Sequence, residues 1–270
     1  MSQMASELFN ASGGAMLNKS YKYRWLIAEL VLRDLRLRYR KSVLGFAWTL
    51  LNPLLFMTIY TLVFSVYLRI AIPHYALFLL CGLIPYNWLS TALSLGATAV
   101  VDGRMYVGKT LFPIEALLIV PVLSTGLNFA LSLPMLFALA YAMHVHLGLA
   151  LIALLPVIAI EWLIIQALVI LFATFNVFYR DVQQIVVYFV TILLYISPIL
   201  YTREMVPRRF GFLITWNPLA PLVTSYQDIL YRGLWPDQHA LIFAAIFGIV
   251  LFGVAYRVFV HYAESFTQYL

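Results

Sequence analysis

The chain has 270 residues, of which 64% are hydrophobic and 10% are charged, whereas an ordinary soluble domain is roughly 45 to 50% apolar and about 25% charged. This composition predicts an all-α polytopic membrane protein and excludes a soluble globular one. The formal net charge is +6, and most of the excess lies in residues 1–41. We interpret the excess as a topology signal and as contact with anionic headgroups, so we expect membrane rather than nucleic acid as a partner.

Residues 1–42 are predicted to be a cytoplasmic N-terminus that contains an amphipathic helix. Residues 1–20 have no basic stretch followed by an apolar core, so we expect no cleaved signal peptide. Two apolar rows follow helical spacing. The first row consists of Ala28, Val31, Leu32, Leu35 and Tyr39, and the second of Leu26, Leu30 and Leu37. Lipid contact requires only one such row, so the second favours a protein partner over packing against the chain's own bundle.

Six apolar segments are long enough to cross a bilayer, which requires about 20 residues. They are residues 43–68, 75–99, 114–143, 149–177, 183–202 and 239–262. An even number of spans places both termini on one side, together with most of the 17 Lys and Arg residues. The opposite side holds Arg69, Arg203, Arg208, Arg209 and Arg232. Because Lys and Arg close to a span stay in the cytoplasm, both termini are predicted to be cytoplasmic, with residues 263–270 as a short tail.

Residues 103–110 read GRMYVGKT and match the phosphate-binding P-loop pattern. A working P-loop follows a buried strand and precedes a helix, but this segment follows a membrane span, and its residues 104–107 are bulky. We therefore interpret the match as false. The alternatives are a short cytoplasmic helix that exposes Arg104 and Lys109 as a docking surface, or a solvated loop.

Glu161 is the one acidic residue deep inside a predicted span. An ionisable group at that depth is a functional candidate, because it must line a wet cavity or pair across the bundle. The sequence does not identify its partner. Cys81 is the only cysteine, so we expect neither a disulfide within the chain nor a thiolate metal site.

Residues 203–238 are too apolar for a free loop and too interrupted for a span. Short apolar runs broken by Pro207, Pro218, Pro221 and Gly233 predict re-entrant or interfacial helices on the outer face. They would form either a gate over whatever the bundle encloses or a cap that seals it against water.

Four segments in order resemble one family. They are RDLRLRYRKSVLGFAWTLLNP (residues 33–53), NVFYRDVQQIV (176–186), SPILY (197–201) and WNPLAPLV (216–223). Together they resemble the ABC-2 type permeases that export polysaccharides such as O-antigen, capsule and teichoic acid. The resemblance covers nearly the whole chain.

The resemblance implies a transport subunit of the bacterial inner membrane that moves a lipid-linked glycan outward. Two copies of the chain would form the pore, and two copies of a separate ATPase subunit would bind ATP and Mg, so no cofactor is expected in this chain. Residues 22–41 would form an interface helix, 102–112 a coupling helix and 203–236 the gate helices of a transmembrane domain spanning 43–262. The residues expected to contact the ATPase are Arg33, Arg36, Leu37, Arg40, Arg104 and Lys109.

The resemblance also suggests a role for the aromatic residues. Aromatic faces stack on the C–H faces of sugars and allow a glycan to slide. The residues expected to line the channel are Phe56, Tyr60, Phe64, Tyr67, Tyr188, Tyr195, Tyr201 and Glu161. For any single aromatic residue, contact with lipid is the simpler interpretation.

Three other classes of protein remain as alternatives. An ABC-2 exporter of a drug or lipid is the nearest, since composition does not separate it from a glycan exporter. A membrane-embedded enzyme acting on lipid-linked sugars should show converging carboxylates or histidines, and no such pair is evident. A proton-coupled carrier or channel should carry more intramembrane ionisable residues than Glu161.

Overall fold

The computed structural model describes residues 23–40, 42–107, 113–145 and 147–270. Throughout these ranges the regular structure is helical, without strands, which confirms the predicted fold class. Helix α3 (Arg24–Tyr39) precedes a 3₁₀ turn at Gly45–Ala47 and helix α4 (Trp48–Tyr60), which continues as a π-helical segment over Thr61–Tyr67. The later helices are α5 (Tyr75–Asp102), α6 (Ile114–Ala142), α7 (Leu154–Phe178, after a 3₁₀ turn at Leu149–Ala153), α8 (Val182–Ile196), α9 (Gly211–Thr215), α10 (Ala220–Gln227), α11 (Gln238–Ala263) and α12 (Phe266–Tyr269).

Five described helical segments are long and apolar enough to cross a bilayer, and the predicted fifth span differs from them. Helix α8 has only 15 residues, about 22 Å at 1.5 Å per residue, which is shorter than a hydrocarbon core of about 30 Å. Its end has a local cause. Ser197 precedes Pro198 and adopts an extended conformation (φ −80°, ψ 146°), because a proline disfavours the helical conformation in the residue before it.

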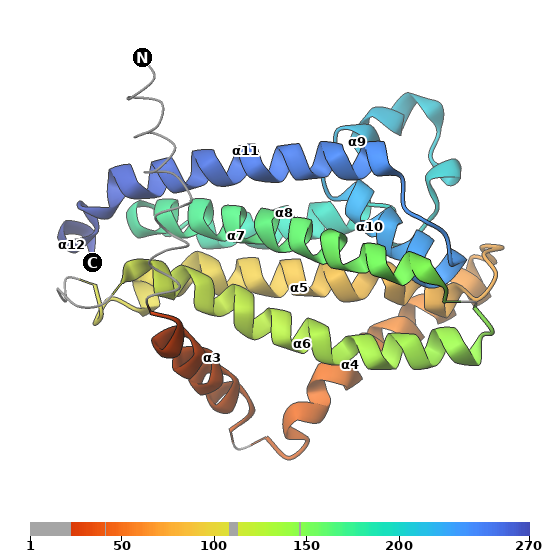
Figure 1. Ribbon diagram of the computed structural model, residues 1–270, viewed down its shortest axis with the longest axis horizontal. Helices are drawn as coiled ribbons and strands as arrows, with labels where there is room; N and C mark the ends of the chain where they lie inside the picture. The colour runs from red at the N-terminus through yellow and green to blue at the C-terminus, as the bar shows by residue number, and fades with distance from the viewer. Residues whose placement is uncertain (1–22, 41, 108–112, 146) are drawn as a thin grey trace.

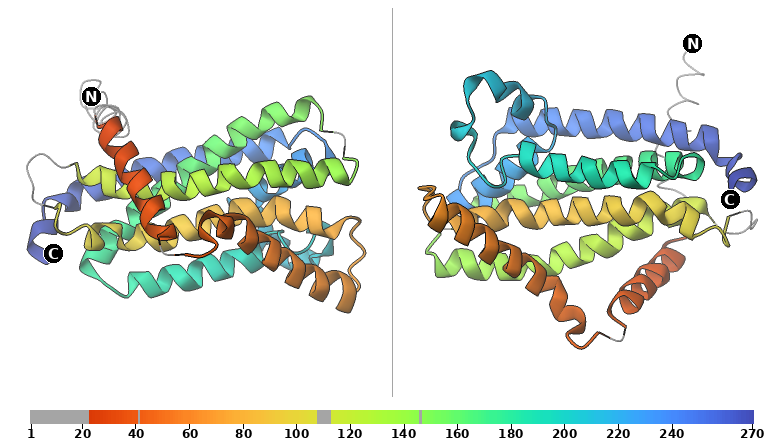
Figure 2. Two further views of the ribbon diagram at one scale, coloured as in Figure 1. Left: turned by 90° about the horizontal axis from the view of Figure 1, so that it is seen from below. Right: turned by 180° about the vertical axis from the view of Figure 1, so that it is seen from behind.

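The long helices pack side by side around α5, while α3 and α4 form an elbow that stands off one side (Figures 1 and 2). Helix α5 contributes the largest share of buried side chains, whereas only Pro53 of α4 is buried in the single chain. The start of α3, the 103–107 turn and the C-terminus lie at one end, and the 203–237 segment lies at the other. Arg104 therefore lies at one end, and Arg203, Arg208, Arg209 and Arg232 lie at the other.

The last residues pack more closely than a free tail. Phe266 of α12 is fully buried, and its ring lies 6.0 Å from both Phe178 and Phe259. The predicted tail at 263–270 is therefore docked on the ends of α7 and α11.

Helices α5 and α7 approach each other closely at Gly96. A Cβ atom built on Gly96 would lie 2.6 Å from Cγ1 of Val169, closer than side chains pack in real structures. The absence of a side chain at this position therefore sets the distance between the two helices.

We expect Gly96→Ala to destabilise the protein by about 1 to 3 kcal/mol, because overpacking forces neighbouring atoms apart. Val169→Ala in the same chain should restore most of the loss, since it removes the methyl groups in the way. Gly253→Ala is the matched control, because no atom lies within 4 Å of its Cβ position. Thermal unfolding of the purified protein measures all four chains, and equal losses at Gly96 and Gly253 would contradict the packing argument.

Candidate functional site

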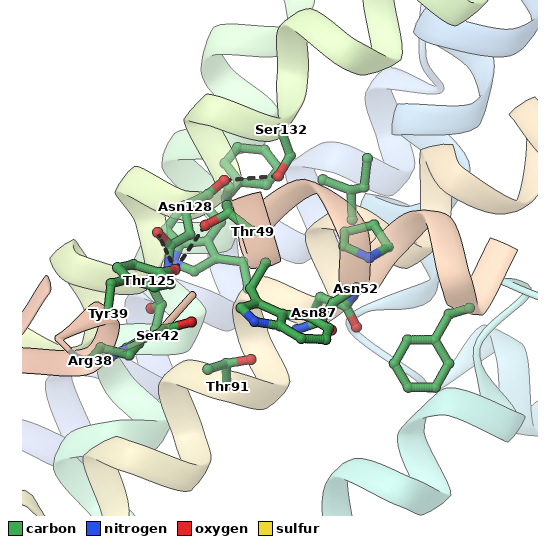
Figure 3. Close-up of a pocket in the computed structure, with 16 residues that line it drawn as sticks. Arg38, Tyr39, Ser42, Thr49, Asn52, Asn87, Thr91, Thr125, Asn128 and Ser132 are labelled. Atoms are coloured by element: carbon green, nitrogen blue, oxygen red, sulfur yellow. Dashed lines mark hydrogen bonds between the residues drawn. The ribbon is translucent and has the colours of Figure 1, made fainter. Parts of the chain in front are cut away.

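A cavity of about 420 Å³ lies between the α3–α4 elbow and helices α5 and α6 (Figure 3). The elbow turns at Gly45, which has a positive φ of 47° and whose backbone N–H donates to Oγ of Ser42 at 3.0 Å. Tyr39 joins three helices, because its hydroxyl lies 2.8 Å from Oγ1 of Thr49 on α4 and donates to Oδ1 of Asn128 on α6 at 3.3 Å. This tyrosine holds the mouth of the cavity in shape.

The cavity wall combines polar groups, which are neutral except for Arg38, with aromatic rings. Its polar residues are Arg38, Tyr39, Ser42, Thr49, Asn52, Asn87, Thr91, Thr125, Asn128 and Ser132, and its aromatic residues include Trp48, Phe56, Trp88 and Phe129. Trp88 and Phe129 stack at 4.9 Å between ring centroids, and Nε1 of Trp88 donates to the carbonyl of Val122 at 3.1 Å. Among the lining residues there is no carboxylate or histidine, so the wall supplies hydrogen bonds and flat apolar faces but no general acid–base pair.

One cation borders this cavity. Arg38 donates from Nη2 to Oδ2 of Asp34 at 2.8 Å, one helical turn earlier. The pair is partly exposed, which makes it a weak contribution to stability. Its main effect is to hold the guanidinium at the edge of the cavity.

A series of aromatic rings leads from the cavity toward the 203–237 end. Neighbouring ring centroids lie 5.5 to 6.3 Å apart. The series runs Phe56, Tyr60, Phe64, Tyr75, Phe78, Tyr231. Three of the channel candidates, Phe56, Tyr60 and Phe64, are thus brought together, and Phe56 also lines the cavity.

The other aromatic candidates are not members of this ring series, although Tyr201 packs against the same apolar cluster as Tyr60 and Phe64. Tyr67 is 70% exposed, and Tyr188 and Tyr195 are 69% and 59% exposed on α8. Tyr201 turns back on the end of α8, where its hydroxyl donates to the carbonyls of Tyr195 at 2.7 Å and Ile196 at 3.0 Å. It satisfies acceptors that the helix end leaves open.

Glu161 lies inside the helical bundle and away from the aromatic series. Its side chain is 3% exposed, and its Oε2 accepts a 2.5 Å hydrogen bond from the hydroxyl of Tyr226 on α10. Tyr226 is 1% exposed. The missing partner of Glu161 is therefore a residue of the 203–238 segment, and the bond ties α10 to the long helix α7.

The 203–238 segment is a chain of short helices, as the interrupted apolar pattern predicted. Nδ2 of Asn217 donates to Oγ of Ser197 at 2.9 Å, and Nε2 of Gln227 donates to the carbonyl of Pro198 at 2.8 Å. Two of the segments that carried the family resemblance, 197–201 and 216–223, therefore contact each other.

A second cavity of about 540 Å³ is lined by the 203–238 segment and by the first turns of α11. Asp228 lines it and accepts a 2.9 Å hydrogen bond from Nη1 of Arg232. Burial raises the pKa of the Asp228 carboxyl above its usual range, and Arg232 opposes that rise. Asp237 caps α11 by accepting from the backbone N–H of His239 at 2.9 Å and of Ala240 at 3.3 Å.

Comparison with known proteins decides the family. The profile described as ABC-2 type transporter matches residues 26–231. The chain belongs to the ABC-2 type transporter family. An O-antigen export system permease protein of Myxococcus xanthus is 35% identical over 94% of this chain and 98% of its own length. A protein of the same description from Klebsiella pneumoniae is 31% identical over 88% and 94%, and a polysialic acid transport protein of Escherichia coli is 22% identical over 83% and 88%.

In this ABC-2 protein, α3 packs on α6 through a face that keeps Val31 and Leu35 of the predicted stripe and adds Ile27. Ile27 and Val31 are the buried residues of α3, whereas Ala28 and Leu32 of the stripe are exposed. Leu30 of the second row packs against the core, while Leu37 stays exposed. Part of the second row thus packs on the chain's own bundle.

The described candidate docking residues lie on α3 and in the turn after α5. Arg36, Leu37, Arg40 and Arg104 are exposed, and Lys109 lies outside the described residues. Nη1 of Arg33 donates to the hydroxyl of Tyr106 at 3.0 Å, so α3 and the turn after α5 are joined directly. Residues 103–107 form a turn in place of the expected helix.

Sequence reasoning missed the amides of the main cavity. Asn52, Asn87 and Asn128 each interrupt an otherwise apolar span, and polar groups inside a membrane usually face other protein groups or a cavity. That signal was present in the sequence. Trp88 carried no such signal, because a tryptophan in a span is equally typical of lipid contact.

We expect Tyr226→Phe to destabilise the protein more than Glu161→Gln. The phenylalanine leaves a buried carboxyl without its donor, which costs about 1 to 3 kcal/mol or more, whereas a glutamine carbonyl still accepts from the tyrosine. The double variant Glu161→Leu, Tyr226→Phe should lose less than the sum of the losses measured for Glu161→Leu and Tyr226→Phe alone. Thermal unfolding in detergent measures the stability of the wild-type protein and of each variant. Additive losses in the double variant would show that the two side chains are not coupled.

Proposed function

We propose that this chain is the permease subunit of an ATP-driven exporter of polysaccharide in the bacterial inner membrane. The observation that carries the proposal is the 35% identity to an O-antigen export system permease over nearly the full length of both chains. The cavity supports it, because amides, hydroxyls and stacked rings recognise sugars, and the lining lacks the acid–base pair of an enzyme. A glycan carried on a lipid fits a cavity at the edge of the helical bundle.

We propose further that the work is done by a separate ATPase subunit, which binds ATP and Mg. The 103–107 part of the GKT segment is a turn after a membrane helix, without the strand that a phosphate-binding loop requires. Two ATPase copies and two copies of this chain would form the transporter. The exposed apolar face of α4 and of the π-helical segment after it supports the proposal of a second copy. This face includes Leu55, Ile59 and Leu62.

In the proposed mechanism the ATPase pushes on α3 and on the turn after α5 at the cytoplasmic end. The Arg33–Tyr106 hydrogen bond makes these two contacts move together. Because Tyr39 joins α3 to α4 and α6, displacement of α3 reaches the cavity and the aromatic series. The Glu161–Tyr226 bond supports a coupling of α7 to the outer gate segment.

The test of docking is charge reversal at one end of the molecule. We expect Arg33, Arg36 and Arg40 changed together to Glu to reduce both the recovered ATPase complex and glycan export by at least about tenfold, because like charges across an interface are repelled. Changing Arg203, Arg208 and Arg209 to Glu is the matched control at the other end. Co-purification with the ATPase encoded beside the permease measures complex formation.

ATP hydrolysis by the purified permease alone, abolished by Lys109→Ala, would overturn the proposal that the energy source is a separate subunit. Unchanged complex recovery in the triple Arg33, Arg36 and Arg40 variant would contradict the docking role of α3. Export of a drug or lipid with no glycan export would assign the protein to another branch of its family.

The aromatic series gives a separate prediction. We expect Phe56→Ala and Tyr60→Ala each to lower glycan export about 2- to 10-fold, because an aromatic contact contributes roughly 0.5 to 1.5 kcal/mol. Tyr141→Ala is the control, since Tyr141 is 84% exposed at the end of α6. Export is measured by labelling surface glycan, with ATPase activity measured alongside, and an equal loss in the Tyr141 variant would contradict a specific role for the series.

A further inference from the structure

A groove of about 800 Å³ is lined by the first half of α3 and by α6 and α7. Its wall is almost wholly apolar. On α6 the lining stretch runs from Ile119 to Leu133, about 21 Å at 1.5 Å per residue. One leaflet of the hydrocarbon core is about 15 Å deep, so the groove is long enough for an acyl chain extended from the interface to the midplane.

Polar groups gather at one end of the groove. Gln166 is 0% exposed and lines the wall, and its Nε2 donates to the carbonyl of Leu118, in the first turns of α6. Arg24 also lines the groove, and α3 crosses α6 in the half nearest the start of α6 (Figures 1 and 2). The opposite end, at Leu133 and Leu155, is apolar. The groove therefore has the polarity of an amphiphile.

Two buried polar atoms of α7 have no hydrogen-bond partner among the described residues. They are Nε1 of Trp162, a donor, and Oε1 of Gln166, an acceptor, and both side chains line the groove. The residues stand one helical turn apart, so their side chains lie on the same face. A hydroxyl group would satisfy both atoms, because it accepts one hydrogen bond and donates another. Leaving them unpaired in hydrocarbon is costly.

We propose that this groove binds one anionic, hydroxyl-bearing glycerophospholipid from the leaflet at the α3 end. The lipid phosphate pairs with the guanidinium of Arg24, a headgroup hydroxyl lies between Trp162 and Gln166, and one acyl chain fills the groove toward Leu133. Basic pockets between transmembrane helices bind anionic headgroups for the same electrostatic reason. The bound lipid fills the space between α3, α6 and α7 and so supports the position of α3.

The test uses the purified full-length permease, stripped of lipid and titrated with phosphatidylglycerol or phosphatidylcholine under native mass spectrometry. We expect phosphatidylglycerol to bind more tightly. Arg24→Ala should weaken phosphatidylglycerol binding about fivefold, since a basic residue near an anionic headgroup contributes about 1 kcal/mol. Arg257→Ala, which removes an exposed charge on α11 outside the groove, should leave it unchanged.

Two further variants test the apolar and the hydroxyl parts separately. Ala159→Phe places a ring in the groove and should abolish binding of both lipids, whereas Ala138→Phe, exposed farther along α6, should not. Trp162→Phe keeps the ring and removes the N–H, and should weaken only phosphatidylglycerol binding, about 2- to 10-fold. Elution as a single species and an unchanged circular dichroism spectrum establish that each variant is folded.

Equal affinity for the two lipids, or unchanged binding in Ala159→Phe, would overturn the proposal. A large gain in lipid binding on deletion of residues 1–20 would assign the groove to that segment instead. A change of oligomeric state in Ala159→Phe without loss of lipid would assign it to a second copy of the chain. Because the measurement needs neither ATPase nor glycan, its failure is distinct from a failure of the proposed export function.

Discussion

The break after α8 is stable only because side chains bind its carbonyl groups. Within a bilayer no water is available to hydrogen-bond a free peptide group, so a helix can end there only if protein groups replace the lost bonds. Four carbonyls around the break accept from side chains, namely those of Tyr195, Ile196, Pro198 and Leu200. The donors are Tyr201, Gln227 and Tyr75. The position of the 203–238 segment depends on these bonds.

The same constraint explains why polar residues in the spans are concentrated in a few places. Asn128 accepts from Tyr39, Gln166 donates to Leu118, and Glu161 accepts from Tyr226. Each bond joins two different helices or the elbow to a helix. The apolar contacts supply most of the packing, and these few directional bonds determine which helix faces which.

Much of the architecture could be predicted from the sequence, and the failures have identifiable causes. Apolar length located the long helices, but it overestimated α8, because Ser197 and Pro198 are part of an apolar run while their backbone is extended. The helical-wheel prediction for α3 located Val31 and Leu35 correctly but missed Ile27, for a different reason. Ile27 belongs to neither predicted row, and it is buried because α3 meets α6 at an angle, which periodicity within one helix does not encode. The Glu161–Tyr226 and Arg33–Tyr106 pairs are 65 and 73 residues apart, so only the fold brings them together.

The π-helical segment at Thr61–Tyr67 fixes the register of the first span. Its bonds run from residue i+5 to residue i, as from the N–H of Leu68 to the carbonyl of Val63 at 2.9 Å, so each hydrogen-bonded ring encloses one more residue than in an α-helix. In an α-helix each residue advances the side-chain direction by about 100°. Loss of a single residue here would let the segment return to α-helical hydrogen bonding, so the helix before and after it would keep nearly the same relative direction. The same loss within α4, between Phe56 and Tyr60, has no such slack and would rotate Phe56 by about 100° relative to Tyr60 and Phe64 while the hydrophobicity of the span stayed the same.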